Sequence, residues 1–162
     1  IRLSLVGSEM CIRDSPMTPD PRFGVEIPFV SLLGFTLEQF ADGASELHYT
    51  PEEAHLNSFG VAHGGACMTL LDVAMATAAR SVEKDMGAVT IEMKTSFMRP
   101  SRGALVAHGK LLHRTATMAF TEARIVDAAG QLCAHATGTF KYVKRLPVGP
   151  RSTQGLRPVS TD

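Results

Sequence analysis

The segment that most constrains the fold is residues 66–82, where Ala, Leu, Met and Thr dominate and neither Pro nor Gly occurs. This composition favours an α-helix. Apolar side chains would lie on nearly every side of that helix, so we expect it to be buried. One buried helix in a small domain needs other elements to wrap around it.

Strands are predicted to supply this cover. In residues 89–98, Val89, Ile91, Met93 and Phe97 alternate with Thr90, Glu92, Lys94 and Ser96, which is the period of a β-strand. Similar patterns and turn residues predict further strands at residues 34–40, 45–50, 104–112, 118–126 and 132–143. A short helix is expected within residues 25–33. The prediction is an α+β domain of two strands, one helix and four strands in a meander, with an antiparallel sheet of five to six strands around one long central helix.

The ends of the chain differ in composition from this domain. Residues 3–15 resemble translated sequencing-adaptor read-through, so residues 1–16 are expected to be artefactual, with Met17 as the natural start. Residues 146–162 are rich in Pro, Gly, Ser and Arg without apolar periodicity. We therefore expect a disordered lead over residues 1–21, a folded domain over 22–145 and a flexible tail over 146–162.

Charge and cysteine content narrow the class of protein. Sixteen basic side chains balance sixteen acidic ones, so no global field would gather nucleic acid or an anionic membrane. No apolar run approaches the roughly 20 residues that span a bilayer. The three cysteines are widely separated and odd in number, which suits a reducing cytoplasm. The six histidines show no metal-ligand spacing, and we expect neither a metal nor another cofactor.

The segment from Asn57 to Asp72 carries the chemistry. Gly64 and Gly65 open the predicted helix, where backbone N–H groups lack partners and can stabilise negative charge on a reacting carbonyl oxygen. Asp72 is the only charged side chain between residues 66 and 79, too far inside the helix to cap it. Partial burial would raise its pKa and its basicity. Such a carboxylate can attack an electrophilic carbonyl carbon or deprotonate a water molecule.

The spacing Asn57…His63-Gly64-Gly65…Asp72 resembles the signature of hotdog-fold thioesterases of the phenylacetate-pathway (PaaI) type. The sequence Val-Thr-Ile-Glu-Met from residue 89, Phe-Met-Arg-Pro from residue 97 and Ala-Thr-Gly-Thr-Phe up to residue 140 also fit that family. The resemblance covers about residues 25–143. It implies an acyl-CoA thioesterase that hydrolyses an aromatic or short- to medium-chain acyl-CoA to the free acid and CoA.

The resemblance also implies roles for single residues. Asp72 would be the base or nucleophile, and the Gly64 N–H would polarise the thioester carbonyl with help from Asn57 and His63. Thr90 falls where this family commonly has a hydroxyl residue that orients water. Residues assigned to CoA or substrate binding are Gly65, Arg99, Arg102 and Arg114, because a neutral protein must hold the nucleotide phosphates with a local cationic cluster.

Helix geometry adds a constraint on these residues. Gly64 and Asp72 are eight positions apart, about 12 Å along one helix at ~1.5 Å per residue. One thioester carbon cannot easily meet both. We therefore expect a homodimer in which Asn57, His63 and Gly64 of one subunit face Asp72 and Thr90 of the partner. The dimer is expected to pair again into a homotetramer, as is common in this family.

Each residue also has a plainer interpretation. Asp72 can be a buried carboxylate bonded to a neighbouring group, and Asn57 and the two glycines can simply form a turn. His63 at a helix start often bonds only the loop, and Thr90 can reflect strand propensity. Cys67 follows His63 by one helical turn, yet a free cysteine on an apolar helix is usually a core residue.

Two other functions remain open at this stage. One is a hotdog hydratase or dehydratase acting on acyl-CoA or acyl-carrier protein, although the His-Gly-Gly spacing does not resemble that class. The other is a non-catalytic acyl-CoA sensor domain on the same fold. Intact Asp72 favours catalysis over sensing.

Overall fold

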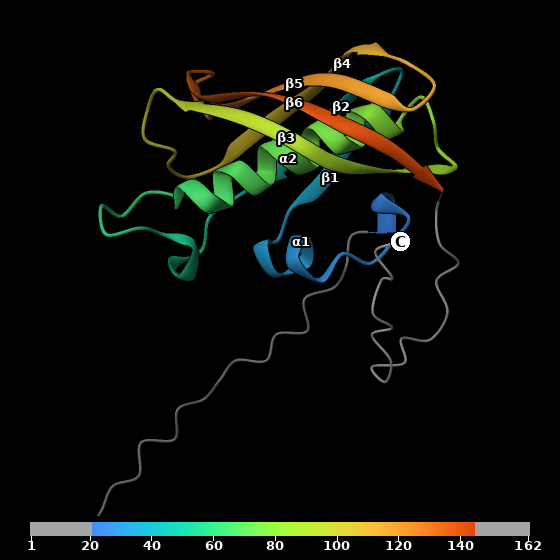
Figure 1. Ribbon diagram of the computed structural model, residues 1–162. Coiled ribbons are helices and arrows are strands. Elements are labelled where there is room, and N and C mark those ends of the chain that lie inside the picture. Colours follow the sequence, from blue (N-terminus) through green and yellow to red (C-terminus); the bar gives the residue numbers. More distant parts are fainter. Residues whose placement is uncertain (1–20, 145–162) are drawn as a thin grey trace, which may run out of the picture.

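A computed structural model describes residues 21–144. It contains one long helix, two short helical elements before it, a further 3₁₀ turn and six strands (Figure 1). The elements are η1 (Pro21–Phe23), α1 (Pro28–Leu33), β1 (Thr36–Ala41), β2 (Ala44–Tyr49), η2 (Glu53–His55), α2 (Gly64–Arg80), β3 (Met86–Phe97), β4 (Leu105–Arg114), β5 (Met118–Asp127) and β6 (Leu132–Lys144). The predicted lead before residue 21 and tail over 146–162 lie outside the described residues.

All six strands form one antiparallel sheet in the order β1-β2-β4-β5-β6-β3. The α+β class and the six-stranded sheet beside one long helix are confirmed. The predicted meander is wrong at β3, which pairs with β6 at the sheet edge and not with β4. Short turns join β1 to β2, β4 to β5 and β5 to β6, but seven residues containing Pro100 separate β3 from β4. This longer connection lets the chain cross from the edge strand β3 to β4, which lies between β2 and β5.

Helix α2 runs along one face of the sheet (Figure 1). It approaches β4 so closely that a Cβ added to Gly109 would lie 2.3 Å from the carbonyl oxygen of Ala74. The hydroxyl of Ser45 donates to the same carbonyl at 2.7 Å, and that of Tyr142 donates to the carbonyl of Ala79 at 2.9 Å. These contacts fix the position of α2 on the sheet.

The helix is not buried on all sides, contrary to expectation. Leu70, Leu71 and Met75 on its sheet side are fully buried. Met68 on the opposite side is 39% exposed, and Asp72 and Ala76 are partly exposed. One curved sheet covers only one side of a helix, so α2 keeps a face, with Met68, Asp72 and Ala76, that the sheet leaves open.

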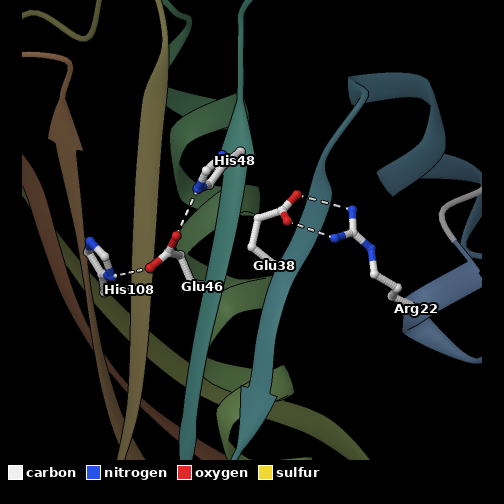
Figure 2. A network of polar contacts seen from close by, with 5 residues as sticks. All are labelled: Arg22, Glu38, Glu46, His48 and His108. Atoms are coloured by element: carbon white, nitrogen blue, oxygen red, sulfur yellow. Dashed lines mark hydrogen bonds and ion pairs between the residues drawn. The ribbon is translucent and has the colours of Figure 1, made fainter.

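The other face of the sheet carries polar side chains and ion pairs (Figure 2). Glu46 on β2 contacts His48 at 2.8 Å and His108 on the neighbouring β4 at 3.5 Å. Arg22 in η1 donates two hydrogen bonds, of 2.8 and 3.1 Å, to Glu38 on β1, and this contact lowers the pKa of that carboxyl group. No helix in residues 21–144 is long and apolar enough to cross a lipid bilayer.

Candidate active site

Asp72 and Thr90 contact each other directly. Asp72 lies in the middle of α2, and the hydroxyl of Thr90 on β3 donates a 2.7 Å hydrogen bond to its Oδ1. Burial raises the pKa of the Asp72 carboxyl group, while the Thr90 hydrogen bond acts in the opposite direction. The pair joins a carboxylate of raised basicity to a hydroxyl whose oxygen can still accept a hydrogen bond from water.

A bulge in β3 makes this contact possible. The register with β6 shifts between Thr90 and Glu92, so Thr90 pairs with Phe140 and Met93 pairs with Gly138. Both β6 residues face α2, because Phe140 is fully buried and a Cβ on Gly138 would touch Met75. The extra residue, Ile91, therefore interrupts the predicted alternation. Thr90 and Met93 face the helix, whereas an unbroken strand would have put them on opposite faces.

His63 is the N-cap residue of α2. Its Nδ1 accepts a 2.9 Å hydrogen bond from the backbone N–H of Gly65. The N–H of Gly64 meets no acceptor within residues 21–144. An unpaired N–H at the positive end of a helix can donate to a ligand carbonyl. His63 thus holds the first turn in place, and Gly64 presents the free donor.

Asn57 organises the loop before the helix. Its Oδ1 accepts from the backbone N–H groups of Phe59 at 2.9 Å and Val61 at 3.4 Å. Its backbone N–H donates to the carbonyl of Val61 at 2.9 Å. With the oxygen engaged by the loop, the side-chain NH₂ group is the part of Asn57 that is available to a ligand.

Asn57 and Gly64 line one cavity of about 340 Å³. The end of β3 and the loop after it line the other side with Phe97, Met98 and Arg99. The complete lining is Asn57, Val61, Ala62, Gly64, Cys67, Phe97, Met98, Arg99, Pro100 and Ser101. Asp72 and Thr90 are not part of it. The predicted catalytic residues therefore fall into two groups along α2, one beside its start and one about 12 Å further along the helix axis.

The predicted CoA contacts do not gather at one point. Arg99 lines the cavity and donates a 2.9 Å hydrogen bond to the carbonyl of Leu132. Arg102 is exposed in the same loop. Arg114 forms an ion pair with Glu83 at the far end of β4, roughly 30 Å away at ~3.4 Å per strand residue. The three guanidinium groups of one chain cannot contact a single phosphate.

Sequence reasoning missed Phe97 and Ser101 as cavity residues. The ring of Phe97 would lie 3.5 Å from a Cβ on Gly64, and Ser101 is buried. Nothing in the strand alternation distinguishes Phe97 from its neighbours.

Cys67 is a core residue, as expected, and burial raises the pKa of its thiol, which disfavours the reactive thiolate. No three His, Cys, Asp or Glu side chains gather to hold a metal ion within residues 21–144.

Residues 59–134 match the sequence model of the Thioesterase superfamily. Human acyl-coenzyme A thioesterase 13 is 30% identical over 115 residues, which cover 68% of this chain and 82% of the relative. An esterase of Saccharolobus solfataricus is 37% identical over 90 residues, covering 55% of this chain and 64% of the relative, just under two thirds of its length.

Solved structures of this fold are similar in shape. A conserved protein of Pseudomonas aeruginosa superposes with a TM-score of 0.70 and 28% identity, covering 72% of this chain and 94% of that one. The PaaI protein of the phenylacetic acid degradation operon of E. coli gives a TM-score of 0.70 at 22% identity, covering 75% and 88%. The hotdog arrangement expected from the sequence is confirmed.

Proposed function

The chain belongs to the thioesterase superfamily and is a thioester hydrolase, and we propose that it hydrolyses an acyl-CoA to the free acid and CoA. The hydrogen bond between Thr90 and Asp72 is the observation that carries this proposal. It combines a half-buried carboxylate with a hydroxyl that can hold water beside it. The free N–H of Gly64 adds an electrophilic donor for the thioester carbonyl.

The proposed reaction begins with the thioester carbonyl oxygen accepting from the Gly64 N–H, assisted by the NH₂ group of Asn57. A water molecule hydrogen-bonded to the Thr90 oxygen transfers a proton to Asp72 as its oxygen adds to the carbonyl carbon. The C–S bond then breaks, and the CoA thiolate takes the proton back from Asp72. Acid and CoA thiol are the balanced products.

Asp72 can also act as the nucleophile. Its carboxylate would then attack the carbonyl carbon, release CoA and leave a mixed anhydride that water hydrolyses. A single turnover in ¹⁸O-labelled water separates the routes. In the general-base route all label enters the acid product. In the nucleophilic route, water that attacks the Asp72 carbon of the anhydride leaves its label in the Asp72 carboxylate, and the first acid product is unlabelled.

We propose that the working site is shared between two subunits of a homodimer. The supporting observation is that the two groups of site residues lie about 12 Å apart on one helix. The open face of α2 and the unpaired edge of β3 are available to a second copy. Each site would then take Asn57, His63 and Gly64 from one subunit and Asp72 and Thr90 from the other.

A mixture of two inactive variants tests this sharing. Asn57→Ala and Asp72→Asn each damage every site in their own homodimers. A hybrid dimer has one site in which both residues are intact and one in which both are changed. Refolding the two variants together should restore roughly one quarter of wild-type activity per chain, because half of the dimers are hybrids with one working site. A mixture no more active than its components would contradict a shared site.

For CoA recognition we propose Gly65, Arg99 and Arg102 at the helix start, with Arg114 reaching the nucleotide from another part of the assembly. Charge reversal at Arg102 should raise KM for acyl-CoA while leaving KM for a short acyl thioester of N-acetylcysteamine unchanged, because that substrate lacks the nucleotide. Equal KM values for acyl-CoA in the variant and the wild type would remove Arg102 from the site. Arg114→Glu is tested in the same pair of assays.

The defining experiment is a panel of aromatic, short-chain and medium-chain acyl-CoAs assayed with a thiol reagent. Release of free thiol that disappears in Asp72→Ala supports the proposal. Changes in enoyl absorbance without thiol release would indicate a hydratase, and tight binding without turnover would indicate a sensor. We also propose a cytoplasmic location, since Cys67 and Cys133 are both free thiols, and a dimer that pairs into a tetramer.

A further inference from the structure

Met68 has an unusual position on the open face of α2. It lies four residues after Gly64 and four before Asp72, so the three share one side of the helix. It is 39% exposed, although its sheet-side neighbours Cys67 and Leu70 are buried. Met68 is therefore a large apolar side chain held between the two groups of site residues.

The symmetry of a shared site determines what Met68 faces. If Gly64 of one subunit and the partner's Asp72 act on one thioester, the two α2 helices run antiparallel across a two-fold axis. Position 68 lies midway between 64 and 72, so it is the position that meets its own copy at the axis. The partner's Met68 then lies opposite Met68, with one thioester site on each side of the pair.

The CoA end and the acyl end of the substrate suit opposite directions along α2. The cavity at the helix start is lined by Asn57 and Arg99, and exposed Arg102 follows its lining residue Ser101 in the chain, which suits the polar and anionic CoA. In the other direction α2 presents Met68 and Thr69. The Thr69 hydroxyl donates back to the carbonyl of Gly65 at 2.9 Å, so this side chain offers its methyl group outwards. The acyl group is better matched to this apolar stretch.

We propose that Met68 and the partner's Met68 form the wall that limits the acyl pocket and thereby select acyl groups by length. This inference rests on the proposed function. The wall lies about 6 Å along the helix from the carbonyl donor, room for a short acyl chain or a single aromatic ring. A flexible, polarisable thioether can adapt to either kind of group.

A crosslinking experiment tests the position of residue 68 without using activity. Met68→Cys, in a chain with Cys11→Ser, is treated with copper phenanthroline or a short bis-maleimide, and covalent dimer is measured on non-reducing gels. Ala76→Cys is the matched control, because it lies on the same side of α2 but about 24 Å from its own copy in an antiparallel pair. Crosslinking at 68 and not at 76 is expected. The reverse pattern, or none at 68 with either reagent, would overturn the proposal.

A chain-length assay tests the selection itself. The ratio of kcat/KM for a long over a short acyl-CoA should rise about ten-fold in Met68→Ala and fall about ten-fold in Met68→Phe. Met68→Leu, of similar volume, should restore the wild-type preference. An unchanged ratio in both the Ala and the Phe variant would overturn the proposal that Met68 limits the acyl pocket. Wild-type protein that hydrolyses no acyl-CoA would contradict the proposed function, whereas the crosslinking result is independent of it.

Discussion

The hydroxyl of Thr90 donates a 2.7 Å hydrogen bond to Oδ1 of Asp72 and so ties the edge strand β3 to the middle of α2. The contact opposes the effect of burial on the pKa of Asp72. Burial disfavours the charged carboxylate, and the hydroxyl stabilises it. The charge state of the proposed base therefore depends on Thr90.

Removing this hydroxyl should shift the pH dependence of catalysis. Asp72 must be ionised to act, so kcat/KM falls as pH drops through its pKa. Thr90→Val deletes the stabilising donor, which raises that pKa and moves the acid limb of the pH profile to higher pH. Thr90→Ser keeps the donor and should leave the limb in place. Profiles of kcat/KM for the three proteins decide this, and coincident limbs for Val and wild type would contradict the assignment.

Asp72→Asn should lower the activity and raise the stability of the protein at neutral pH. Folding raises the pKa of Asp72 above its unfolded value of 3.8. The protonated carboxyl group therefore contributes its whole share of stability below that pH, and this share is lost as pH rises through the folded-state pKa. Asn carries no charge and can still accept from Thr90. The variant should lose at least about 10³-fold in kcat and have a higher Tm than wild type at pH 7. That gain should vanish near pH 3.5, and a lower Tm at neutral pH would contradict the argument.

Asn57 offers a test that separates loop structure from catalysis. Asn57→Asp keeps the oxygen that accepts from Phe59 and Val61 but loses the NH₂ donor. It should retain a Tm close to wild type and lose about 10²- to 10³-fold in kcat. Asn57→Ala loses both functions and should also melt at lower temperature. Near-normal turnover in Asn57→Asp would remove the NH₂ group from the mechanism.

For His63, capping and catalysis can be distinguished by a second capping residue. Asn is a good N-cap and can accept from the Gly65 N–H in place of the imidazole nitrogen. His63→Asn should keep most of the activity and stability, whereas His63→Ala should lower the free energy of unfolding by about 1 kcal/mol. A large loss of kcat in His63→Asn with unchanged Tm would instead indicate that the imidazole takes part in the reaction.

Gly109 should be the glycine of the sheet least tolerant of substitution. In Gly109→Ala the added methyl group would lie 2.3 Å from the Ala74 carbonyl and 2.5 Å from the Ser45 hydroxyl. The helix would have to move, at a cost of about 1–3 kcal/mol. Gly138→Ala is the control, because its nearest neighbours are the flexible end of Met75 and the ring edge of Phe140, both at 3.0 Å and both side chains, whereas Gly109 meets backbone. Chemical denaturation should show the larger loss for Gly109→Ala.

The extents of the elements were largely predictable from local patterns. The structure confirms the hairpin of β1 and β2, the long helix and the four later strands close to their expected residues. The thioesterase family was predictable from the spacing of Asn57, His63-Gly64-Gly65 and Asp72, and the comparisons confirm it. The roles of these residues, the subunit sharing and the acyl group stay predictions.

The sequence by itself determined what short-range physics controls: helix and strand periodicity, the two glycines at the start of α2 and the carboxylate in its middle. Only the tertiary structure decided that β3 pairs with β6, that a bulge at Ile91 turns Thr90 towards Asp72, and that one side of α2 stays open at Met68. Strand order and bulge position depend on contacts between residues far apart in the chain. A pattern of alternating side chains within one strand does not indicate which distant strand will pair with it.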